Sequence, residues 1–456
     1  MKRFKEFISL LSISTAIILA GCGGGGGGSD ATDFWAADMV SEEYYQVSAS
    51  LHSEGKYCKI YVEDDSRYNV NDTTINIVMD EFDNKIYPKI TSKFGKESDV
   101  DGNGKIVLLI LDIRDGFNGT GGYVAGYFDS ANTLSKSLFN PYSNECDMIY
   151  LDCYPADPMT IDFQMTVAHE FQHLINFTQK GLSDGIYQDT WINEGLSSAA
   201  EYIYSGSHLS DRISYYNTYQ STYSCGDNFY KWDNELIDYS TVYMFFQWIR
   251  IHSVDGDAIY KDILFSIYSD YGAVVEQMRD HCSLYNGISV SRSSWIQIMT
   301  DWLIANQINL STGKYGYKGE ITGLTKMTST NDSVGYTAAY PYEGMIQSIT
   351  EGYAPESGSG SNITYLAFNS NGEIDNSSAY GDGLSGTKYL LAINTNTDTY
   401  GSYEKVILPA SIKSDILKSY SEIEPQIYKI DILPGQTSLP VKDKQAERKR
   451  ILESLK

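Results

Sequence analysis

Several features that define common protein classes are scarce in this sequence of 456 residues. Positive charge is scarce, because 34 Lys and Arg residues stand against 59 Asp and Glu, for a formal net charge of -25. A nucleic-acid-binding surface needs clustered basic groups, so this balance argues against a nucleic-acid partner. After residue 21 the chain lacks an apolar run of about 18 residues, and no membrane-spanning helix is expected there. The 42% hydrophobic and 20% charged residues indicate a globular protein.

Cysteine is also scarce, and its spacing excludes two common uses. The six cysteines include no Cys-x-x-Cys pair, so neither that zinc-binding spacing nor the corresponding redox motif is present. Beyond Cys22 the number is odd, which leaves at least one thiol without a partner in the chain. Cys146 and Cys153 flank a predicted strand at an odd offset, so they should point to opposite faces. The pairing among the remaining cysteines stays open: Cys58, Cys146, Cys153, Cys225 and Cys282.

The first residues resemble an export signal, with three basic groups before an apolar stretch over residues 8–20. The sequence Leu-Ala-Gly-Cys that ends at Cys22 resembles a bacterial lipobox. We therefore expect a signal peptide over residues 1–21, a lipid on Cys22, and attachment to the cell envelope at the outer membrane or cell surface. The alternative is an ordinary secretory signal with an incidental cysteine. Six glycines follow, and residues 22–50 are expected to form a flexible tether.

The order of apolar patterns then predicts an α+β protein. Short apolar runs predict strands at 56–62, 105–113, 121–128 and 147–152, and helical spacing predicts helices at 73–93, 160–179, 191–205, 239–252, 256–268, 271–282 and 292–308. These elements are expected to form one domain over residues 51–310.

The composition changes after residue 310, where Gly, Ser, Thr, Asn and Tyr predominate. We expect a C-terminal all-β domain over residues 311–440 and a charged tail over 441–456. The strands of this domain are predicted at 344–350, 362–369, 387–394, 404–409 and 426–432.

One predicted helix carries two histidines at a metal-binding spacing. His169 and His173 are four residues apart, so their rings lie on one helix face, one turn apart. Two neutral imidazoles in this arrangement can bind one Zn²⁺ ion. Glu170 follows the first histidine and can take a proton from a water in the open coordination position. The motif therefore predicts a catalytic zinc site, which needs a third protein ligand.

The candidate third ligand is Glu194, in the sequence Trp-Ile-Asn-Glu-Gly at the start of the next predicted helix. This resembles the gluzincin pattern, in which an Asn-Glu pair on a following helix supplies the ligand. Glu201 lies seven residues later on the same helix face and could accept a hydrogen bond from the far nitrogen of a ligand histidine. The simpler alternatives are an acid at a helix start for Glu194 and a partly solvated helix acid for Glu201.

The segments 94–106, 121–128, 169–177 and 191–202 together resemble the hyicolysin family of zinc metallopeptidases. The resemblance covers roughly residues 70–250. It implies a zincin, thermolysin-like fold, one zinc ion per chain and hydrolysis of peptide bonds. It also implies that Glu170 acts as base and proton shuttle and that the zinc ligands are His169, His173 and Glu194. Membrane-type aminopeptidases share Trp-x-Asn-Glu-Gly but also use Gly-x-Met-Glu-Asn, which this sequence lacks, so an endopeptidase is favoured.

A donor beside the metal is needed to stabilise the negative charge of the tetrahedral intermediate. Tyr239 begins a later predicted helix, and its placement is similar to that of the transition-state tyrosine of the aminopeptidases. Tyr243, one turn later, is the alternative. The other imidazole candidates are His208, His252 and His281.

The acidic turn at 99–105 resembles the first half of a calcium-binding loop, with side-chain oxygens at positions one, three and five and Gly at six. The twelfth position is Ile110, so a bidentate ligand would come from elsewhere, with Asp112 and Asp115 as candidates. The alternative is an ordinary Asp/Gly turn before a strand. The candidate calcium ligands are Asp99, Asp101, Asn103 and Lys105.

These patterns predict an exported, zinc-dependent endopeptidase that acts on proteins or peptides. Its substrate is expected to lie extended along an edge strand, either 121–128 or 146–152. The alternative from another functional class is a surface adhesin with a vestigial zinc site. Such a protein would not need Glu170 as a base.

Overall fold

The computed structural model describes residues 31–64, 70–223, 232, 234–282, 284–285, 288–290, 292–325, 336–355, 357–397 and 404–407. The predictions for the signal peptide, Cys22, Cys225, the strand at 426–432 and the charged tail lie outside these residues. Within the described part of the chain, no helix has both the length and the apolar character needed to cross a bilayer.

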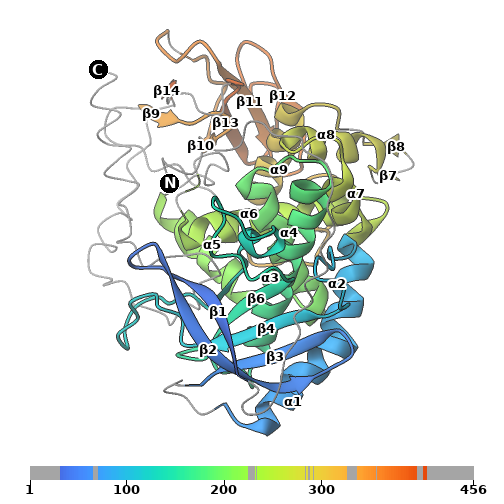
Figure 1. Cartoon of the computed structure of the whole chain (residues 1–456). Helices are drawn as coiled ribbons and strands as arrows, with labels where there is room; N and C mark the ends of the chain where they lie inside the picture. Colours follow the sequence, from blue (N-terminus) through green and yellow to red (C-terminus); the bar gives the residue numbers. More distant parts are fainter. Residues whose placement is uncertain are drawn as a thin grey trace. The chain divides into compact units, whose positions relative to one another are not determined.

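A six-stranded sheet has the strand order β1-β2-β3-β4-β6-β5 (Figure 1). The central strands β3, β4 and β6 are parallel, while β1, β2 and β5 are antiparallel to their neighbours. Both faces of β4 and β6 are covered, which explains their unbroken apolar sequences. The strands are β1 (Ala31–Asp38), β2 (Glu43–Glu54), β3 (Cys58–Glu63), β4 (Ile106–Leu111), β5 (Gly126–Tyr127) and β6 (Met148–Asp152).

The prediction of a flexible tether up to residue 50 is wrong for residues 31–50, which form β1 and most of β2. Only one face of each strand is buried, with Phe34 and Ala36 inside on β1 and Val47 and Ala49 inside on β2. Between them, Ser48 on β2 is exposed and Trp35 on β1 is half-buried, so the segment shows no continuous apolar run that would mark a buried strand.

The helix predicted over 73–93 is divided by a π-helical segment. It consists of α1 (Asp72–Glu81), the π-helical residues Phe82–Ile86, and α2 (Tyr87–Phe94). Pro88 lies in the first turn of α2, where a missing backbone N–H is tolerated.

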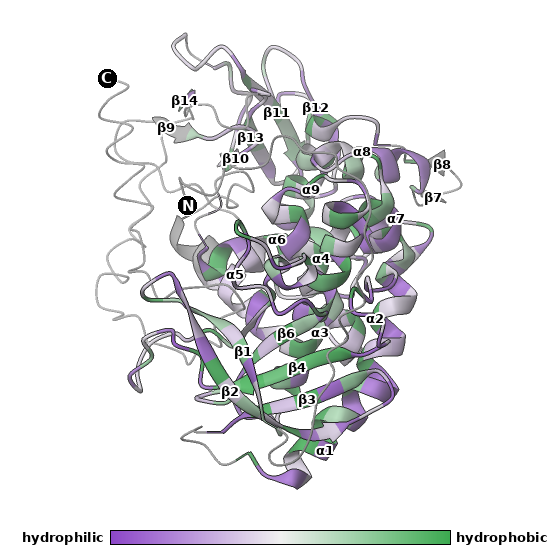
Figure 2. Cartoon of the chain, in the orientation of Figure 1, coloured by the Kyte–Doolittle hydropathy of each residue, from purple (hydrophilic) through white to green (hydrophobic). Residues whose placement is uncertain are grey.

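A group of helices packs on one face of the sheet, and α3 (Ile161–Phe177) and α4 (Thr190–Ser205) pack against each other within it (Figure 1). Thr160 begins α3 by accepting a hydrogen bond from the Phe163 N–H. Figure 2 shows apolar residues concentrated on β4 and α4. The remaining α-helices are α5 (Ser210–Tyr223), α6 (Leu236–His252), α7 (Ile259–Phe265), α8 (Tyr271–Asp280) and α9 (Trp295–Ile308).

The two faces of the sheet carry separate hydrophobic clusters. Alternate residues of β4 belong to different clusters, for example Leu108 and Leu109. Cys153 belongs to the cluster under the helices and Cys146 to the other, as their odd offset predicts.

The described residues after 310 contain strands and no α-helix, so the prediction of a mixed α and β fold with a β-rich C-terminal region is confirmed. Four strands form an antiparallel sheet in the order β10-β13-β11-β12. This sheet packs on α9. Leu303 of α9 lies so close to Gly344 of β10 that a Cβ atom on Gly344 would be 2.4 Å from Cδ1 of Leu303. The strands are β9 (Tyr336–Ala339), β10 (Gly344–Ile349), β11 (Ile363–Asn369), β12 (Ile374–Asp375), β13 (Lys388–Asn394) and β14 (Glu404–Ile407); β9 pairs with β14, and β7 (Leu284–Tyr285) with β8 (Ile288–Ser289).

Candidate metal centre

Helices α3 and α4 bring three predicted ligands to one point. The Oε2 atom of Glu194 lies 3.3 Å from Nε2 of His169 and 3.4 Å from Nε2 of His173. Charge-assisted hydrogen bonds are shorter, about 2.7–2.9 Å. Two ligand atoms of a tetrahedral zinc ion, each about 2.1 Å from the metal, would lie about 3.4 Å apart. These two distances therefore fit the ligands of one zinc ion better than a pair of charge-assisted hydrogen bonds.

Buried polar atoms without partners support the same interpretation. Nε2 of His169, Oε2 of Glu194 and both carboxylate oxygens of Glu170 are buried and have no hydrogen-bond partner among the described residues. Such atoms are rare in folded proteins, where buried polar groups are nearly always paired. Two imidazole nitrogens and a carboxylate oxygen are a donor set that suits zinc.

The opposite nitrogens of both histidines are held by neighbouring side chains. Nδ1 of His169 lies 2.8 Å from Oε1 of Glu201, and Nδ1 of His173 lies 3.1 Å from Oδ1 of Asn193. Each acceptor oxygen favours the tautomer with its hydrogen on Nδ1, which leaves the lone pair of Nε2 for a metal. The structure thus places Glu201 against the far nitrogen of a candidate ligand histidine, the contact that its spacing from Glu194 allows. The contact of Asn193 with His173 was not predicted from the sequence, although the position of Asn193 directly before Glu194 could have indicated it.

The site is strongly acidic. Burial raises the pKa of Glu170 to about 7, against the opposing effect of the histidines. Burial also disfavours the charged form of Glu194, yet His173 and His169 bring its pKa down to about 2. Burial opposes a positive charge on His169, but the neighbouring carboxylates of Glu194 and Glu201 outweigh it and raise the pKa of His169 to about 10. The carboxylates therefore create a strong preference for positive charge at this point.

The edge strand β5 lies directly against the candidate base. A Cβ atom on Gly126 would lie 2.8 Å from the Tyr150 carbonyl oxygen, 3.0 Å from Cγ2 of Thr166 and 3.3 Å from Cγ of Glu170. Only glycine allows this approach without a shift of the strand or the helix. The strand predicted over 121–128 is thus reduced to two paired residues, held next to Glu170.

Tyr239 and Tyr243 have different surroundings on α6. Tyr239 is fully buried, and burial followed by the charge of Glu194 raises its pKa well above the usual value. Its hydroxyl therefore stays protonated beside the acidic site. The Tyr243 hydroxyl instead accepts a hydrogen bond from the Leu209 N–H at 2.9 Å and lies 3.0 Å from Nδ1 of His208. Tyr243 thus stabilises the α4–α5 connection.

The other candidate imidazoles contact groups elsewhere. The ring of His208 stacks on Tyr202. Nε2 of His252 lies 2.8 Å from the Gly316 carbonyl oxygen, and Nδ1 of His281 lies 2.5 Å from Oδ2 of Asp255.

Arg212 on α5 is a further charged group beside the centre. One of its terminal nitrogens lies 3.9 Å from Oε2 of Glu201, and both side chains are buried. Its Nε atom is buried without a hydrogen-bond partner among the described residues. Arg212 therefore balances part of the negative charge behind His169. Sequence patterns missed it because α5 is mostly polar and shows no clear apolar stripe.

At the acidic turn the structure brings Asp147 to Asp99 and Asp101, with one carboxylate oxygen of each within 4.8 Å of the others. Asp147 accepts hydrogen bonds from the Ser98 hydroxyl and the Val100 N–H. Backbone N–H groups bond to side-chain oxygens of Asp99 (from Gly104), Asp101 (from Asn103) and Asn103 (from Lys105).

Neither alternative calcium ligand belongs to this carboxylate group. Asp115 instead accepts hydrogen bonds from the N–H groups of Val124 and Phe117. Calcium binding at the turn stays a prediction.

Comparison with known proteins finds no family model that matches the chain. The chain is similar to the neutral metalloprotease ShpI of Staphylococcus hyicus, with 32% identity over 305 residues. The aligned part is 64% of this chain and 66% of that protein, so the chain spans just under two thirds of its relative's length. The resemblance found in the four motif segments is thereby confirmed.

Proposed function

The chain is a relative of the hyicolysin-type metallopeptidases, and from this premise we propose that it is a zinc-dependent endopeptidase acting on proteins or peptides outside the cell. The observation that supports this most is the convergence of the three candidate ligands. Oε2 of Glu194 lies 3.3 Å from Nε2 of His169 and 3.4 Å from Nε2 of His173. The unpartnered carboxylate of Glu170 follows directly on the same helix.

In this proposal His169, His173 and Glu194 hold the zinc ion. The chemistry that a bound zinc ion supplies is polarisation of the scissile carbonyl and a lowered pKa of water, toward about 7. Glu170 accepts the proton of the attacking water and then donates it to the leaving amine. Burial, and the lack of a hydrogen-bond partner among the described residues, leave both of its oxygens available for this transfer.

We assign the stabilising donor to Tyr239. Its neutral hydroxyl would donate to the substrate oxygen that becomes negative in the tetrahedral intermediate. Tyr239 is fully buried on α6, and α6 packs against α4, the helix that carries Glu194.

The proposed substrate pairs with the outer edge of β5. Among the described residues this strand ends the sheet, so an extended peptide could add to its outer edge. The alternative prediction of an edge strand at 146–152 is wrong, because β6 is paired with β4 on one side and with β5 on the other.

The test uses peptides with acetylated N-termini and amidated C-termini, and the same peptides with free termini, incubated with the purified chain and with Glu170→Gln. We expect internal cleavage by the wild type and a loss of at least about 100-fold in the variant, with zinc bound to both. Cleavage restricted to peptides with a free N-terminus would instead support an aminopeptidase. Zinc binding without cleavage by either protein would support the adhesin. Attachment through a lipid on Cys22 stays a separate proposal, tested by mass spectrometry of the envelope-bound protein.

A further inference from the structure

We propose that a pocket beside His173 receives an uncharged aromatic or apolar side chain from the substrate residue that precedes the cleaved bond. The inference rests on the proposed function, because it names the substrate that this site would select.

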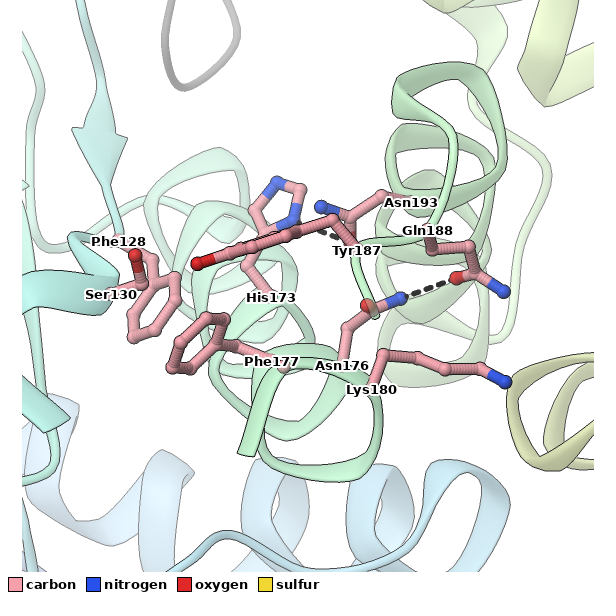
Figure 3. Close-up of a pocket in the computed structure, with 10 residues that line it drawn as sticks. Phe128, Ser130, His173, Asn176, Phe177, Lys180, Tyr187, Gln188 and Asn193 are labelled. Atoms are coloured by element: carbon pink, nitrogen blue, oxygen red, sulfur yellow. Dashed lines mark hydrogen bonds between the residues drawn. The ribbon is translucent and has the colours of Figure 1, made fainter. Parts of the chain in front are cut away.

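The pocket has a volume of about 170 Å³ and lies where α3, α4 and the segment after β5 meet (Figure 3). His173 lines it and is also a candidate zinc ligand, so the pocket adjoins the reacting centre. Pockets for whole small molecules have about 300–1,000 Å³, whereas one water takes about 30 Å³. This volume therefore suits one side chain rather than a separate ligand.

Aromatic rings form one side of the pocket. Figure 3 shows Phe128 and Phe177 together on this side, with the ring of Tyr187 near that of Phe177. The ring centroids of Phe128 and Phe177 are 6.0 Å apart, and those of Phe177 and Tyr187 are 5.8 Å apart. Such spacing allows edge or offset contacts with a further ring or an aliphatic chain.

The opposite side is polar, and two contacts engage most of its amide groups, while Nε2 of Gln188 is buried without a hydrogen-bond partner among the described residues. Nδ2 of Asn176 donates to Oε1 of Gln188 at 2.7 Å, and Oδ1 of Asn193 is 3.1 Å from Nδ1 of His173. These contacts hold the amides in place opposite the rings. The aromatic side therefore offers the main surface for an incoming side chain.

Among the described residues, the pocket offers no charged group that is available to pair with a charged substrate side chain. Lys180 lines it, but its Nζ contacts the carbonyl oxygens of Ser266 and, at 3.3 Å, Tyr268. Figure 3 shows this amino group directed away from the aromatic rings. Among the described residues that line the pocket, none is an acid. Because burial of an unpaired charge costs several kcal/mol, an uncharged side chain is selected.

Strand direction determines which substrate residue enters. Phe128 directly follows β5, so the pocket lies at the C-terminal end of that strand. Antiparallel pairing is slightly more stable than parallel pairing. A peptide antiparallel to β5 has its N-terminal part at this end, which places a residue before the cleaved bond in the pocket.

Tyr187 is the best position for a test, because its side chain is 60% exposed and its replacement should leave the fold intact. Wild type, Tyr187→Ala and Tyr187→Lys are incubated with a mixed peptide pool, and the cleavage sites are read by mass spectrometry. The matched control is Phe139→Ala, an aromatic residue that is 86% exposed and does not line the pocket.

We expect the wild type and Phe139→Ala to prefer uncharged aromatic or apolar residues before the cleaved bond, by tenfold or more over charged ones. Tyr187→Ala should weaken this preference about three- to tenfold. Tyr187→Lys should raise cleavage after acidic residues. Two results would overturn this inference alone, provided that the wild type cleaves peptides. One is an unchanged residue preference before the cleaved bond in both Tyr187 variants, and the other is a preference that changes only after the cleaved bond. No cleavage by the zinc-loaded wild type would overturn the proposed function and this inference with it.

Discussion

Glu201 lies behind the candidate metal ligands, and its replacement should weaken zinc binding without removing a ligand. Its Oε1 atom is 2.8 Å from Nδ1 of His169, and the two residues are 4% and 0% exposed. Removal of such an outer partner typically weakens metal binding about 10- to 100-fold, or about 1.4–2.8 kcal/mol. We expect Glu201→Gln near the lower limit, because its amide oxygen can still accept the hydrogen bond. Glu201→Ala should lie near the upper limit.

The assay is competition for zinc between each protein and a chromophoric chelator, at one pH and ionic strength. Glu351→Gln removes the same charge at an exposed position and should keep the wild-type affinity. Melting temperatures in zinc-free buffer separate weakened binding from weakened folding. A zinc dissociation constant within twofold of wild type for both Glu201 variants would refute the role of this hydrogen bond in orienting His169.

Two further predictions concern packing and pH. Gly126→Ala should lower kcat/KM by about ten- to a hundredfold, because the new Cβ would meet the Tyr150 carbonyl oxygen at 2.8 Å and displace β5 or Glu170. Gly383→Ala, where a Cβ meets nothing within 4 Å, is the control, and equal activity of both variants would contradict the packing argument. Burial lowers the pKa of His252 to about 3, so below pH 6.5 the unfolded chain binds a proton that the folded chain excludes. Wild type should therefore lose about 1.6 kcal/mol more unfolding free energy between pH 6.5 and 5 than His252→Gln does. Urea unfolding at both pH values measures this difference, and equal losses would show that His252 is not the source.

The elements that could be predicted from the sequence are those whose surroundings impose a uniform pattern. Both faces of β4 are buried, so its sequence is continuously apolar, and α3 is buried over nearly its whole length. In β1 only alternate residues are buried, and a preceding glycine run made the segment look like part of a tether. Helix α5 is rich in Tyr, Ser and Thr, which gives no clear apolar face.

The candidate site shows the same limit. His169, Glu170 and His173 share one helix, so their relation follows from helical geometry alone. The spacing of Glu201 from Glu194 places it on the same face of α4 but does not say which side chain it meets. The approach of Arg212 from another helix depends on tertiary packing that no local pattern contains.

The most direct test is the zinc content of the purified chain, measured beside its peptide hydrolysis, for wild type, Glu170→Gln and Glu194→Ala. We expect one zinc ion per chain in wild type and Glu170→Gln, hydrolysis only in wild type, and much weaker zinc retention in Glu194→Ala. The absence of zinc from the wild type after loading and dialysis, or wild-type hydrolysis by Glu170→Gln, would contradict a catalytic zinc centre at these residues.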